Sequence, residues 1–409
     1  MHKLLFLVTA LSLSCVAAPP AVEQQTRALQ TVLHQADDAY YNRHKSIMSD
    51  AAYDALRKQY DRLVSDYPEL AEPNPIGAPV KKTTSRVAHD APVLSFNKVY
   101  SDEGILRFLE KTGTNLLYCV EPKLDGLTVV LRYRDGLLTQ ALTRGDGTTG
   151  VDVTPAVLAS GAVPAQLNHA PAQFDVRGEM ILPLPAFEKL NQRRIANGES
   201  ALKSPRNAAA GSLMLHDYAE VAARNLQVQF FELLKTDSPP PTQRAALALL
   251  KKSGLPVVES ITIPADDVLP AIHELNDRRA NFPYETDGIV IKVNDLSVRD
   301  RLGATAHHPR SAMARKYKEV PVQTRLLAVK WTTGKSGKRT PVAVFEPVEI
   351  HGATLQRATL HNLDFIRAMD LKIGDWIHVI RAGGSVPEII GVITDRRDGR
   401  ETEILEPQE

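Results

Sequence analysis

Residues 118–134, YCVEPKLDGLTVVLRYR, place charged side chains inside an otherwise apolar run. Because successive side chains of a strand point to opposite faces, Glu121 and Lys123 share one face of this run. Asp125 and Gly126 then permit a turn, after which a second apolar strand begins. Taken alone, the pattern fits an ordinary hairpin with an ion pair on its surface.

A second apolar run, GIVIKV at residues 288–293, favours a chemical site over that interpretation. In a strand, Lys292 shares a face with Val290, opposite to the three other β-branched residues. A lysine in the middle of such a run costs free energy unless it meets an anion. We therefore expect Lys292 to find an anionic partner inside the fold.

Further groups that bind anions or metals occur in the same part of the chain. Asp287 directly precedes the second run, and Arg177 and Glu179 share a strand face. Arg144 opens the glycine-rich loop RGDGTTG, whose backbone N–H groups we expect to be free to meet phosphate. Each feature alone is explained by a solvated charge, a surface loop or a strand-end ion pair. Together they predict a cleft for a nucleotide and a divalent metal.

The pattern of apolar residues predicts an α+β fold with three units. A small N-terminal helical domain comes first, a domain of alternating strands and helices follows, and a small β-barrel ends the chain. Ser49 fits the N-cap of the second helix, and we expect the charged tail after Thr394 to fray. The predicted units are residues 19–78, 79–322 and 323–409.

Composition excludes several classes of protein. The 409 residues carry 49 Lys or Arg against 48 Asp or Glu, a net charge of +1, which excludes a polycationic coat protein. Two cysteines exclude a disulfide scaffold and a four-cysteine zinc site.

Residues 1–18 have a short basic start, an apolar run and small residues, which is typical of a secretory signal peptide. The run is too short to predict a transmembrane helix. We therefore expect a periplasmic or secreted protein with no stable membrane association once the signal is removed. A cytoplasmic location follows instead if the segment is not cleaved.

In order, the motifs of this sequence resemble those of the bacterial NAD-dependent DNA ligases, within the covalent nucleotidyltransferases. The resemblance covers nearly all of residues 22–395. It implies a nucleotidyltransferase (adenylation) domain in the middle and an OB-fold for the barrel. The motifs that carry it are EPKLDG (121–126), TRGDGTTGVDVT (143–154), VRGEM (176–180), SPRNAAAGSL (204–213), TDGIVIKV (286–293), ARKYK (314–318), TPVAVFEPV (340–348) and ATLHN (358–362).

The resemblance implies a role for each matching residue. Lys123 corresponds to the catalytic nucleophile that takes AMP from NAD, and Asp125 to the catalytic acid beside it. Lysine amines are protonated near neutral pH, so this one must lose a proton before it attacks. Glu179 and Asp287 correspond to carboxylates near Mg²⁺. The residues implied to bind NAD are Tyr40, Asp50, Tyr53, Asp54, Ser95, Phe96, Glu121, Arg144, Glu179, Arg206, Lys292 and Lys316.

The N-terminal helical domain bears on the choice of cofactor. Ligases that use ATP resemble this family in the core but lack this domain, which in the NAD users binds the nicotinamide mononucleotide (NMN) half. The spacing of Asp50, Tyr53 and Asp54 puts them on one helix face. A purely structural explanation remains for two of them. Asp50 would complement the helix N-terminus, and Tyr53 would pack in a core.

Residues 310–339 hold nine Lys or Arg against one acidic residue. Beside an OB-like barrel, such a density favours contact with a phosphate backbone over a merely solvated surface. The expected partner is nicked double-stranded DNA, bound by a monomer. We expect NAD and Mg²⁺ as cofactors and no zinc.

Departures from the family pattern qualify these expectations. Tyr41 stands where the family usually has His. Met214 stands where the family usually has a second Arg after the SPRNAAAGSL motif. Lys335 stands where the basic turn of the family's barrel carries Arg. Longer members continue into a zinc finger, a helix-hairpin-helix domain and a BRCT domain, whereas this sequence resembles the short DNA ligase B branch. Fewer phosphate contacts imply a weaker hold on nicked DNA, so we expect weak nick sealing.

Two other classes of function stay open. One is an enzyme that adenylylates itself but no longer ligates, as the residues at Tyr41 and Met214 suggest. The other is an exported nucleic-acid-binding protein that uses the barrel without catalysis. Transfer of AMP from ATP instead of NAD would favour a capping-type or ATP-dependent transferase.

Overall fold

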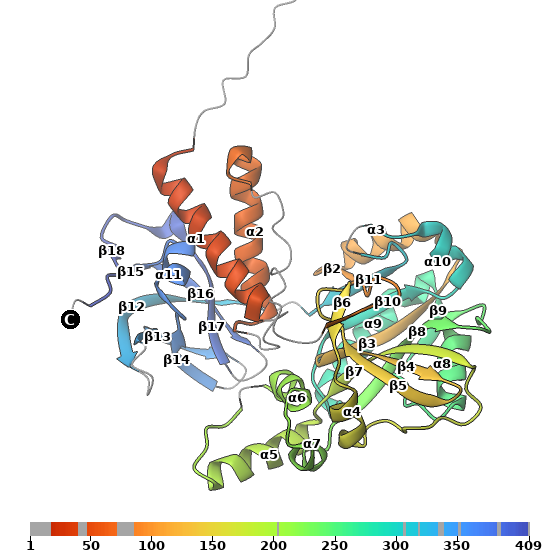
Figure 1. Ribbon diagram of the computed structural model, residues 1–409. Coiled ribbons are helices and arrows are strands. Elements are labelled where there is room, and N and C mark those ends of the chain that lie inside the picture. Colours follow the sequence, from red (N-terminus) through yellow and green to blue (C-terminus); the bar gives the residue numbers. More distant parts are fainter. Residues whose placement is uncertain are drawn as a thin grey trace, which may run out of the picture.

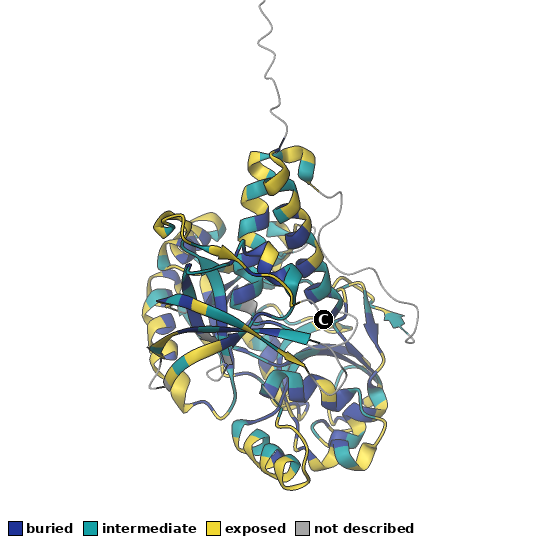
Figure 2. Cartoon of the chain, turned by 90° about the vertical axis from the view of Figure 1, so that its left-hand side faces the viewer, coloured by how far each residue is buried: buried dark blue, intermediate teal, exposed yellow. Residues whose placement is uncertain are grey.

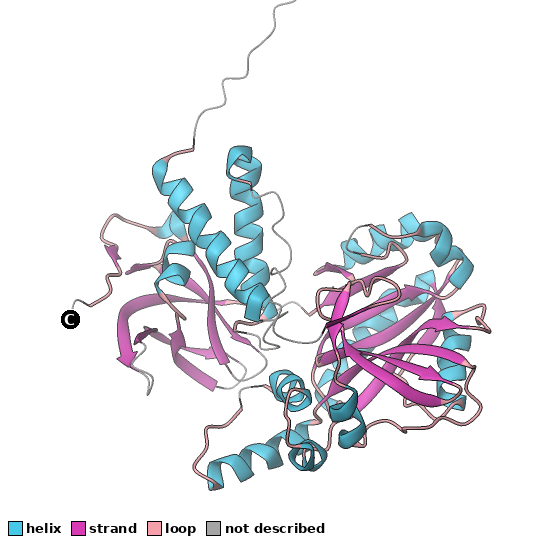
Figure 3. Ribbon diagram, viewed as in Figure 1, coloured by secondary structure: helices cyan, strands magenta, loops and turns pink. Residues whose placement is uncertain are grey.

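The computed structural model describes residues 18–39, 47–71, 86–202, 204–305, 308–317, 320–333, 339–350, 353–382 and 386–407. Figure 1 shows two helices and a barrel on one side and a larger α+β body on the other. Helices and strands alternate through the larger body, whereas the barrel is mostly strand (Figure 3). The predicted α+β class is confirmed.

Two antiparallel helices form the N-terminal unit: α1 (Pro20–Asp37) and α2 (Asp50–Asp66). Ser49 is the N-cap of α2, as predicted, and its hydroxyl accepts a hydrogen bond from the Ala52 amide at 3.1 Å. A 3₁₀ turn, η2 (Pro68–Leu70), follows α2. Most of the predicted signal peptide lies outside the described residues, so it remains a prediction.

The middle unit contains two antiparallel-rich sheets, joined where β3 turns into β4. One sheet has the order β2-β11-β10-β3-β9 and the other β5-β4-β7-β8, while β1 pairs with β6 separately. The strands are β1 (Arg86–Ala88), β2 (Asn97–Val99), β3 (Leu117–Leu124), β4 (Leu127–Arg134), β5 (Leu137–Thr143), β6 (Thr149–Val151), β7 (Gln173–Ile181), β8 (Gln227–Thr236), β9 (Ile261–Pro264), β10 (Thr286–Val293) and β11 (Ala312–Lys316).

Helices cover the outer faces of both sheets. Apolar side chains of α3 and α9 pack on β10, and those of α4 to α8 pack on the second sheet. The helices are α3 (Asp102–Thr112), α4 (Thr154–Ser160), α5 (Leu184–Ala196), α6 (Pro205–Leu213), α7 (Tyr218–Ala223), α8 (Gln243–Lys252), η3 (Ala265–Asp267), α9 (Val268–Asp277), η4 (Arg279–Asn281) and α10 (Leu296–Leu302).

The turn between β3 and β4 requires a glycine. A Cβ on Gly126 would lie 2.2 Å from the Met180 carbonyl oxygen of β7, which is far inside van der Waals contact. This close approach brings the end of β3 onto the second sheet. Lys123 and Asp125 are therefore held at the junction of the two sheets.

The C-terminal unit is a five-stranded sheet of order β14-β13-β12-β16-β17, curled so that its two edge strands approach each other. This curled sheet is the small β-barrel that the sequence predicts. The elements are β12 (Val322–Thr333), β13 (Arg339–Ile350), β14 (Ala353–Thr359), α11 (Leu363–Ala368), β15 (Lys372–Ile373), β16 (Trp376–Ala382), β17 (Val386–Val392), η5 (Thr394–Arg396) and β18 (Thr402–Glu403).

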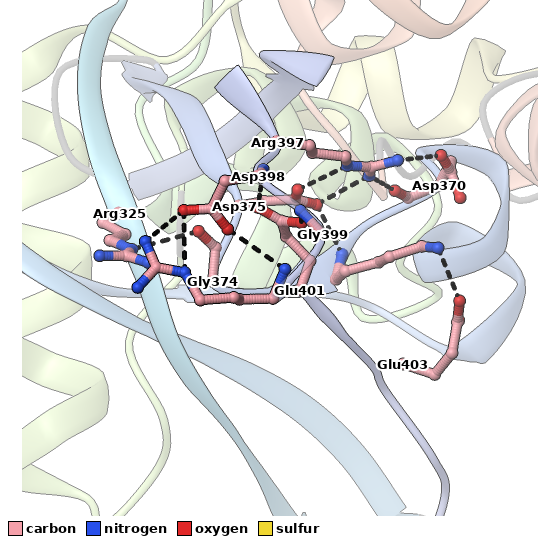
Figure 4. A network of polar contacts seen from close by, with 11 residues as sticks. Arg325, Asp370, Gly374, Asp375, Arg397, Asp398, Gly399, Glu401 and Glu403 are labelled. Atoms are coloured by element: carbon pink, nitrogen blue, oxygen red, sulfur yellow. Dashed lines mark hydrogen bonds and ion pairs between the residues drawn. The ribbon is translucent and has the colours of Figure 1, made fainter. Parts of the chain in front are cut away.

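The expectation that the tail frays after Thr394 is wrong for the described residues. The guanidinium of Arg397 donates to the buried carboxylate of Asp375 at 2.7 and 2.9 Å and to Asp370 at 2.6 Å (Figure 4). These hydrogen bonds raise the pKa of Arg397. Strand β18 also pairs with β15. The ion pairs of Arg397 and this strand pairing together hold the charged tail against the barrel.

The N-terminal helices and the barrel share one hydrophobic core. Leu29 and Leu33 of α1 and Leu56 of α2 belong to the same buried cluster as Phe365 and Ile389 of the barrel. Figure 2 shows these helices with buried residues toward the barrel and exposed residues outward. The first and last segments of the chain thus form one packed body.

No helix within the described ranges combines the length and apolar character needed to cross a bilayer.

Candidate active site

A cleft lies between the N-terminal helices and the junction of the two middle sheets. Twelve of the predicted site residues line it, and side chains from α1 and α2 face those from β3, β7 and β10. The predicted residues that line the cleft are Tyr53, Asp54, Ser95, Phe96, Glu121, Lys123, Asp125, Arg144, Glu179, Arg206, Lys292 and Lys316.

Lys123 lies near the end of β3 and forms an ion pair with Asp287. Its Nζ donates to both carboxylate oxygens of Asp287 at 2.8 Å, and Lys316 lies 3.5 Å from the same carboxylate. The pairing of β3 with β10, and of β10 with β11, explains this convergence, since Lys123 and Lys316 both lie opposite Gly288. The Lys123 amine is thus oriented by a carboxylate and remains partly exposed to the cleft.

Lys292 meets the anion that its apolar surroundings require. Its Nζ lies 2.7 Å from Glu121, and the two side chains are 1% and 2% exposed. The same Nζ donates to the Phe231 carbonyl at 2.8 Å. The expected pairing of Lys292 is confirmed, and its partner is the carboxylate that shares a strand with Lys123.

Two phenyl rings flank this ion pair. Phe96 and Phe231 have ring centroids 6.4 Å apart, and Lys292 Nζ lies 5.7 and 4.9 Å from their centroids. Arg177 lies against the same rings and pairs with Glu232 at 3.1 Å. The two rings, in tilted contact with each other, give the cleft an apolar aromatic wall beside buried charges.

The acidic residues beside Lys123 have cationic or hydroxyl partners. Asp125 pairs with Arg206 at 3.0 Å, and Thr128 donates to Glu179 at 2.9 Å. Burial raises the pKa of Glu179, although the nearby charge of Lys123 opposes that rise. The site therefore holds alternating charges close together.

The glycine-rich loop after Arg144 differs from the expectation. Arg144 reaches the Ser95 hydroxyl at 2.8 Å, so the side chain serves the cleft. The Thr148 and Thr149 amides donate to Asp146 at 2.9 and 2.7 Å, and the Gly147 amide donates to the Arg144 carbonyl. These N–H groups are used inside the loop and do not await a phosphate, which corrects the prediction.

The predicted nicotinamide-side residues come from α2. The Tyr53 hydroxyl donates to the buried Asp37 of α1 at 2.9 Å. Asp54 bonds Lys98 and Tyr100 of the middle unit across the cleft. The spacing argument therefore placed both residues on the correct face of the helix. The side chain of Asp50, and Tyr40 and Tyr41 entirely, lie outside the described residues.

Comparison with known proteins shows the family. The model of the NAD-dependent DNA ligase adenylation domain matches residues 81–320, more than half of the chain. The chain belongs to the NAD-dependent DNA ligase family. The family's OB-fold domain matches residues 323–401, and the DNA ligase-like N-terminal NAD⁺-binding domain matches residues 19–75.

Curated relatives agree with this family assignment. A DNA ligase of Petrotoga mobilis is 36% identical over 402 residues, which cover 95% of this chain and 60% of the relative. A DNA ligase of Cytophaga hutchinsonii is 38% identical over 381 residues, 90% of this chain and 57% of the relative. This chain thus spans about three fifths of the length of these ligases.

Solved structures add little to the assignment. A structure titled Pmar-Lig_Pre. aligns over 80% of this chain and 66% of its own at 13% identity and a TM-score of 0.39. A likeness of that size carries no conclusion about function.

Sequence reasoning missed several cleft residues of this ligase-family chain. Phe231, Asp37 and Lys98 line the cleft, but only contacts between distant segments reveal them. Arg177 is one of the charged groups from which the sequence predicts the cleft, but it receives no role there. The aromatic residues in the strand-like run QFFELL could have pointed to Phe231, whereas nothing local distinguishes Lys98.

The described residues do not form a preorganised metal site. No group of three His, Cys, Asp or Glu side chains among them is placed to hold an ion. The two predicted metal-binding residues, Glu179 and Asp287, contact Thr128 and the two lysines described above. Mg²⁺ often binds through one or two carboxylates plus substrate phosphates, so these residues fit a metal only together with a phosphate ligand.

The described cations of the basic run at 310–339 have different surroundings. Lys316 lines the cleft, and Arg315 pairs with Asp102 at 3.0 Å. Arg325 donates to the Gly374 carbonyl, whereas Lys330 is exposed on β12. Contact of this run with a phosphate backbone stays a prediction, and Lys318, Lys335 and Lys338 lie outside the described residues.

Glu285 gives this site a pH-dependent effect on stability. Burial, and secondarily the charge of Asp125, raise the pKa of Glu285 from 4.5 to about 7. The folded state therefore binds more protons than the unfolded state between these values, so the free energy of unfolding falls as pH rises through this window. The loss in the free energy of unfolding is at most about 3.5 kcal/mol, at about 1.4 kcal/mol per pH unit.

We expect Glu285→Gln to remove most of this pH dependence. Urea unfolding at pH 5 and pH 8 would measure it in both proteins. The exposed Glu349→Gln should leave the difference between the two pH values unchanged. An equal fall in stability in wild type and Glu285→Gln would contradict the assignment of the effect to this carboxyl.

Proposed function

We propose that this protein is an NAD-consuming DNA ligase that seals nicks between a 3′-hydroxyl and a 5′-phosphate. The observation that carries the proposal is that Lys123 and the α2 residues Tyr53 and Asp54 line one cleft. A nucleophilic lysine at one end and an NAD⁺-binding helical unit at the other suit attack on the pyrophosphate between the two halves of NAD.

In the proposed first step, Lys123 Nζ forms a bond to the α-phosphorus of NAD. The bond from that phosphorus to the bridging oxygen breaks, and NMN leaves with that oxygen. The amine must first lose a proton, and Asp287 is the carboxylate in direct contact with it. AMP is left on the lysine as a phosphoramidate.

The remaining steps transfer AMP to DNA and then release it. An oxygen of the 5′-phosphate at the nick displaces Lys123 from the adenylyl phosphorus. The 3′-hydroxyl then attacks the activated 5′-phosphorus, and AMP leaves as the strand is sealed. Throughout, Lys316 and Arg206 lie close enough to the cleft to stabilise charge on the phosphate oxygens.

In this proposal the adenine ring packs on the aromatic wall that Phe96 and Phe231 form in the cleft. The ion pair of Glu121 with Lys292 and the hydrogen bond from Arg144 to Ser95 supply polar groups in the same cleft. Magnesium bound with the phosphates would neutralise their charge, with Asp287 and Glu179 as the candidate carboxylates.

Incubation with NAD, followed by intact-mass spectrometry, tests the proposal. We expect an AMP adduct from NAD and Mg²⁺ and none from ATP, because the helical unit contacts only the part of NAD that ATP lacks. Transfer to nicked DNA should follow but be slow relative to longer family members, as Met214 supplies no charge. An adduct from ATP alone would favour the ATP-dependent alternative.

Two results would support the other classes. An adduct from NAD with no transfer to any nicked duplex would indicate a self-adenylylating enzyme that no longer ligates. Nucleic-acid binding without any adduct, in protein shown to be free of bound AMP, would indicate the binding protein. Sealing at the rate of longer ligases would contradict the expected weak activity.

The proposed location outside the cytoplasm rests on the signal-like residues 1–18 alone. A fusion of this segment to an export reporter tests it directly. Retention of the reporter in the cytoplasm would remove the basis for export.

A further inference from the structure

The N-terminus of helix α2 is bound by a carboxylate from the barrel. The Ser49 amide donates to the two oxygens of Glu388 at 3.1 and 3.2 Å, and the Ser49 hydroxyl donates to one of them as well. Glu388 lies on β17, 339 positions along the chain, and is 7% exposed. A buried carboxylate therefore joins the two ends of the protein.

This contact completes the N-terminal cap of α2, in which the neighbouring residues supply no acceptor for the Ser49 amide. In a capping box, the N-cap hydroxyl accepts from the N3 amide, and an acidic side chain at N3 accepts from the N-cap amide. Here Ser49 accepts from Ala52 at N3, but alanine has no group to return the bond. Glu388 supplies that acceptor, and its negative charge complements the positive end of the helix dipole.

The position of this cap bears on the cleft because α2 carries cleft residues in its first turns. Tyr53 and Asp54 lie four and five residues after Ser49 and line the cleft opposite Lys123. A helix is stiff over one or two turns, so a shift at Ser49 moves both side chains. Positioning errors of this kind weaken catalysis even when no reacting group is lost.

We propose that Glu388 is a positioning residue for NAD: it holds α2 so that Tyr53 and Asp54 meet the nicotinamide half. The barrel then takes part in the first chemical step as well as in contacts to DNA. This inference rests on the proposed use of NAD as the AMP donor.

Other contacts keep the helices attached when Glu388 is altered. The Asn362 side-chain amide donates to Gln35 of α1 at 3.1 Å, and Gln25 donates to the Ala368 carbonyl at 3.3 Å. The shared hydrophobic core lies beneath them. Removal of the Glu388 carboxylate should therefore loosen the start of α2 without separating the helices from the barrel.

We expect Glu388→Ala to raise the KM for NAD in Lys123 adenylylation by about 5- to 10-fold, the ratio equivalent to loss of one helix cap. Sealing of a nick that already carries AMP should proceed at the wild-type rate, since no nicotinamide group is present in that step. Glu388→Gln keeps an acceptor oxygen and should show an intermediate KM. Glu349→Ala, exposed on the same barrel, is the matched control and should change neither step.

Amide hydrogen exchange gives a readout that is independent of catalysis. The Ala52 amide should exchange faster in Glu388→Ala, whereas the amides of β10 should be unchanged. Slower sealing of the pre-adenylylated nick together with a raised KM would show a general structural defect and overturn the positioning role. If the wild-type protein reacts with NAD, an unchanged KM for NAD in Glu388→Ala would overturn it as well. A wild-type protein that never reacts with NAD would overturn the proposed function, and this inference with it.

Discussion

Lys123→Ala is expected to abolish formation of the AMP adduct, with a loss of at least about 10⁴-fold in the rate of adenylylation. The reason is that in the proposed reaction the ε-amine nitrogen bonds to phosphorus, and no other described amine contacts Asp287 at 2.8 Å. Lys316 lies 3.5 Å from Asp287 and is nearly buried, so it is poorly placed to replace the nucleophile. Intact-mass spectrometry with NAD and Mg²⁺ measures the adduct.

Two controls separate loss of chemistry from loss of structure. Lys123→Ala should bind nucleotide and unfold at a urea concentration close to that of wild type, because the lysine is partly exposed. Lys123→Arg keeps a positive charge beside Asp287 but should also form no adduct. An adduct of normal yield in either variant would place the nucleophile at another residue.

Glu121→Ala is expected to lower the free energy of unfolding by about 3–5 kcal/mol, because it leaves the buried Lys292 without its anionic partner. Lys292 is 1% exposed and lies 2.7 Å from Glu121, so the variant leaves its charge buried without the carboxylate partner. The weaker hydrogen bonds from Gln243 and Ser260 to Glu121, both at 3.3 Å, would be lost too. Urea unfolding followed by circular dichroism measures the change.

The double variant Glu121→Leu with Lys292→Met provides the decisive comparison. Removal of both charges should recover most of the lost stability, since two apolar side chains fit the surrounding rings and strands. The exposed helix pair Glu23 and Arg27, 3.5 Å apart, is the control, and Glu23→Ala should cost less than about 1 kcal/mol. A double variant as unstable as Glu121→Ala would show that packing, and not charge pairing, dominates at this site.

The sequence predicts an anionic partner for Lys292 but does not identify Glu121 as that partner. The apolar pattern around Lys292 required an anion, but it could not say that the anion is Glu121. That choice depends on the antiparallel register in which Val290 lies opposite Glu121 and Lys292 opposite Cys119. Registers between strands 170 residues apart are set by the whole sheet, so local pattern does not determine them.

Among the cleft residues, too, some can be found from local sequence patterns, whereas others are brought to the site only by contacts between distant segments. The resemblance of the motifs identifies Lys123, Tyr53 and Asp54, and a strand face and a helix face, both local properties, agree with their positions in the cleft. Lys98 and Glu388 belong to the site or its support only because separate units approach each other, and neither carries a local signal. The free amides expected in the loop after Arg144 were assigned wrongly because Asp146 folds back to accept them.

The shared core of the N-terminal helices and the barrel also has a consequence for the order in which the chain folds. The apolar faces of α1 and α2 are complete as soon as the first 70 residues emerge, yet their partners Phe365 and Ile389 are synthesised some 300 residues later. At about 5–20 residues per second, that interval lasts on the order of tens of seconds. During this time the apolar faces of the two helices lack the barrel surface on which they pack in the folded protein. The core of the amino-terminal unit is therefore completed only after the barrel has been synthesised.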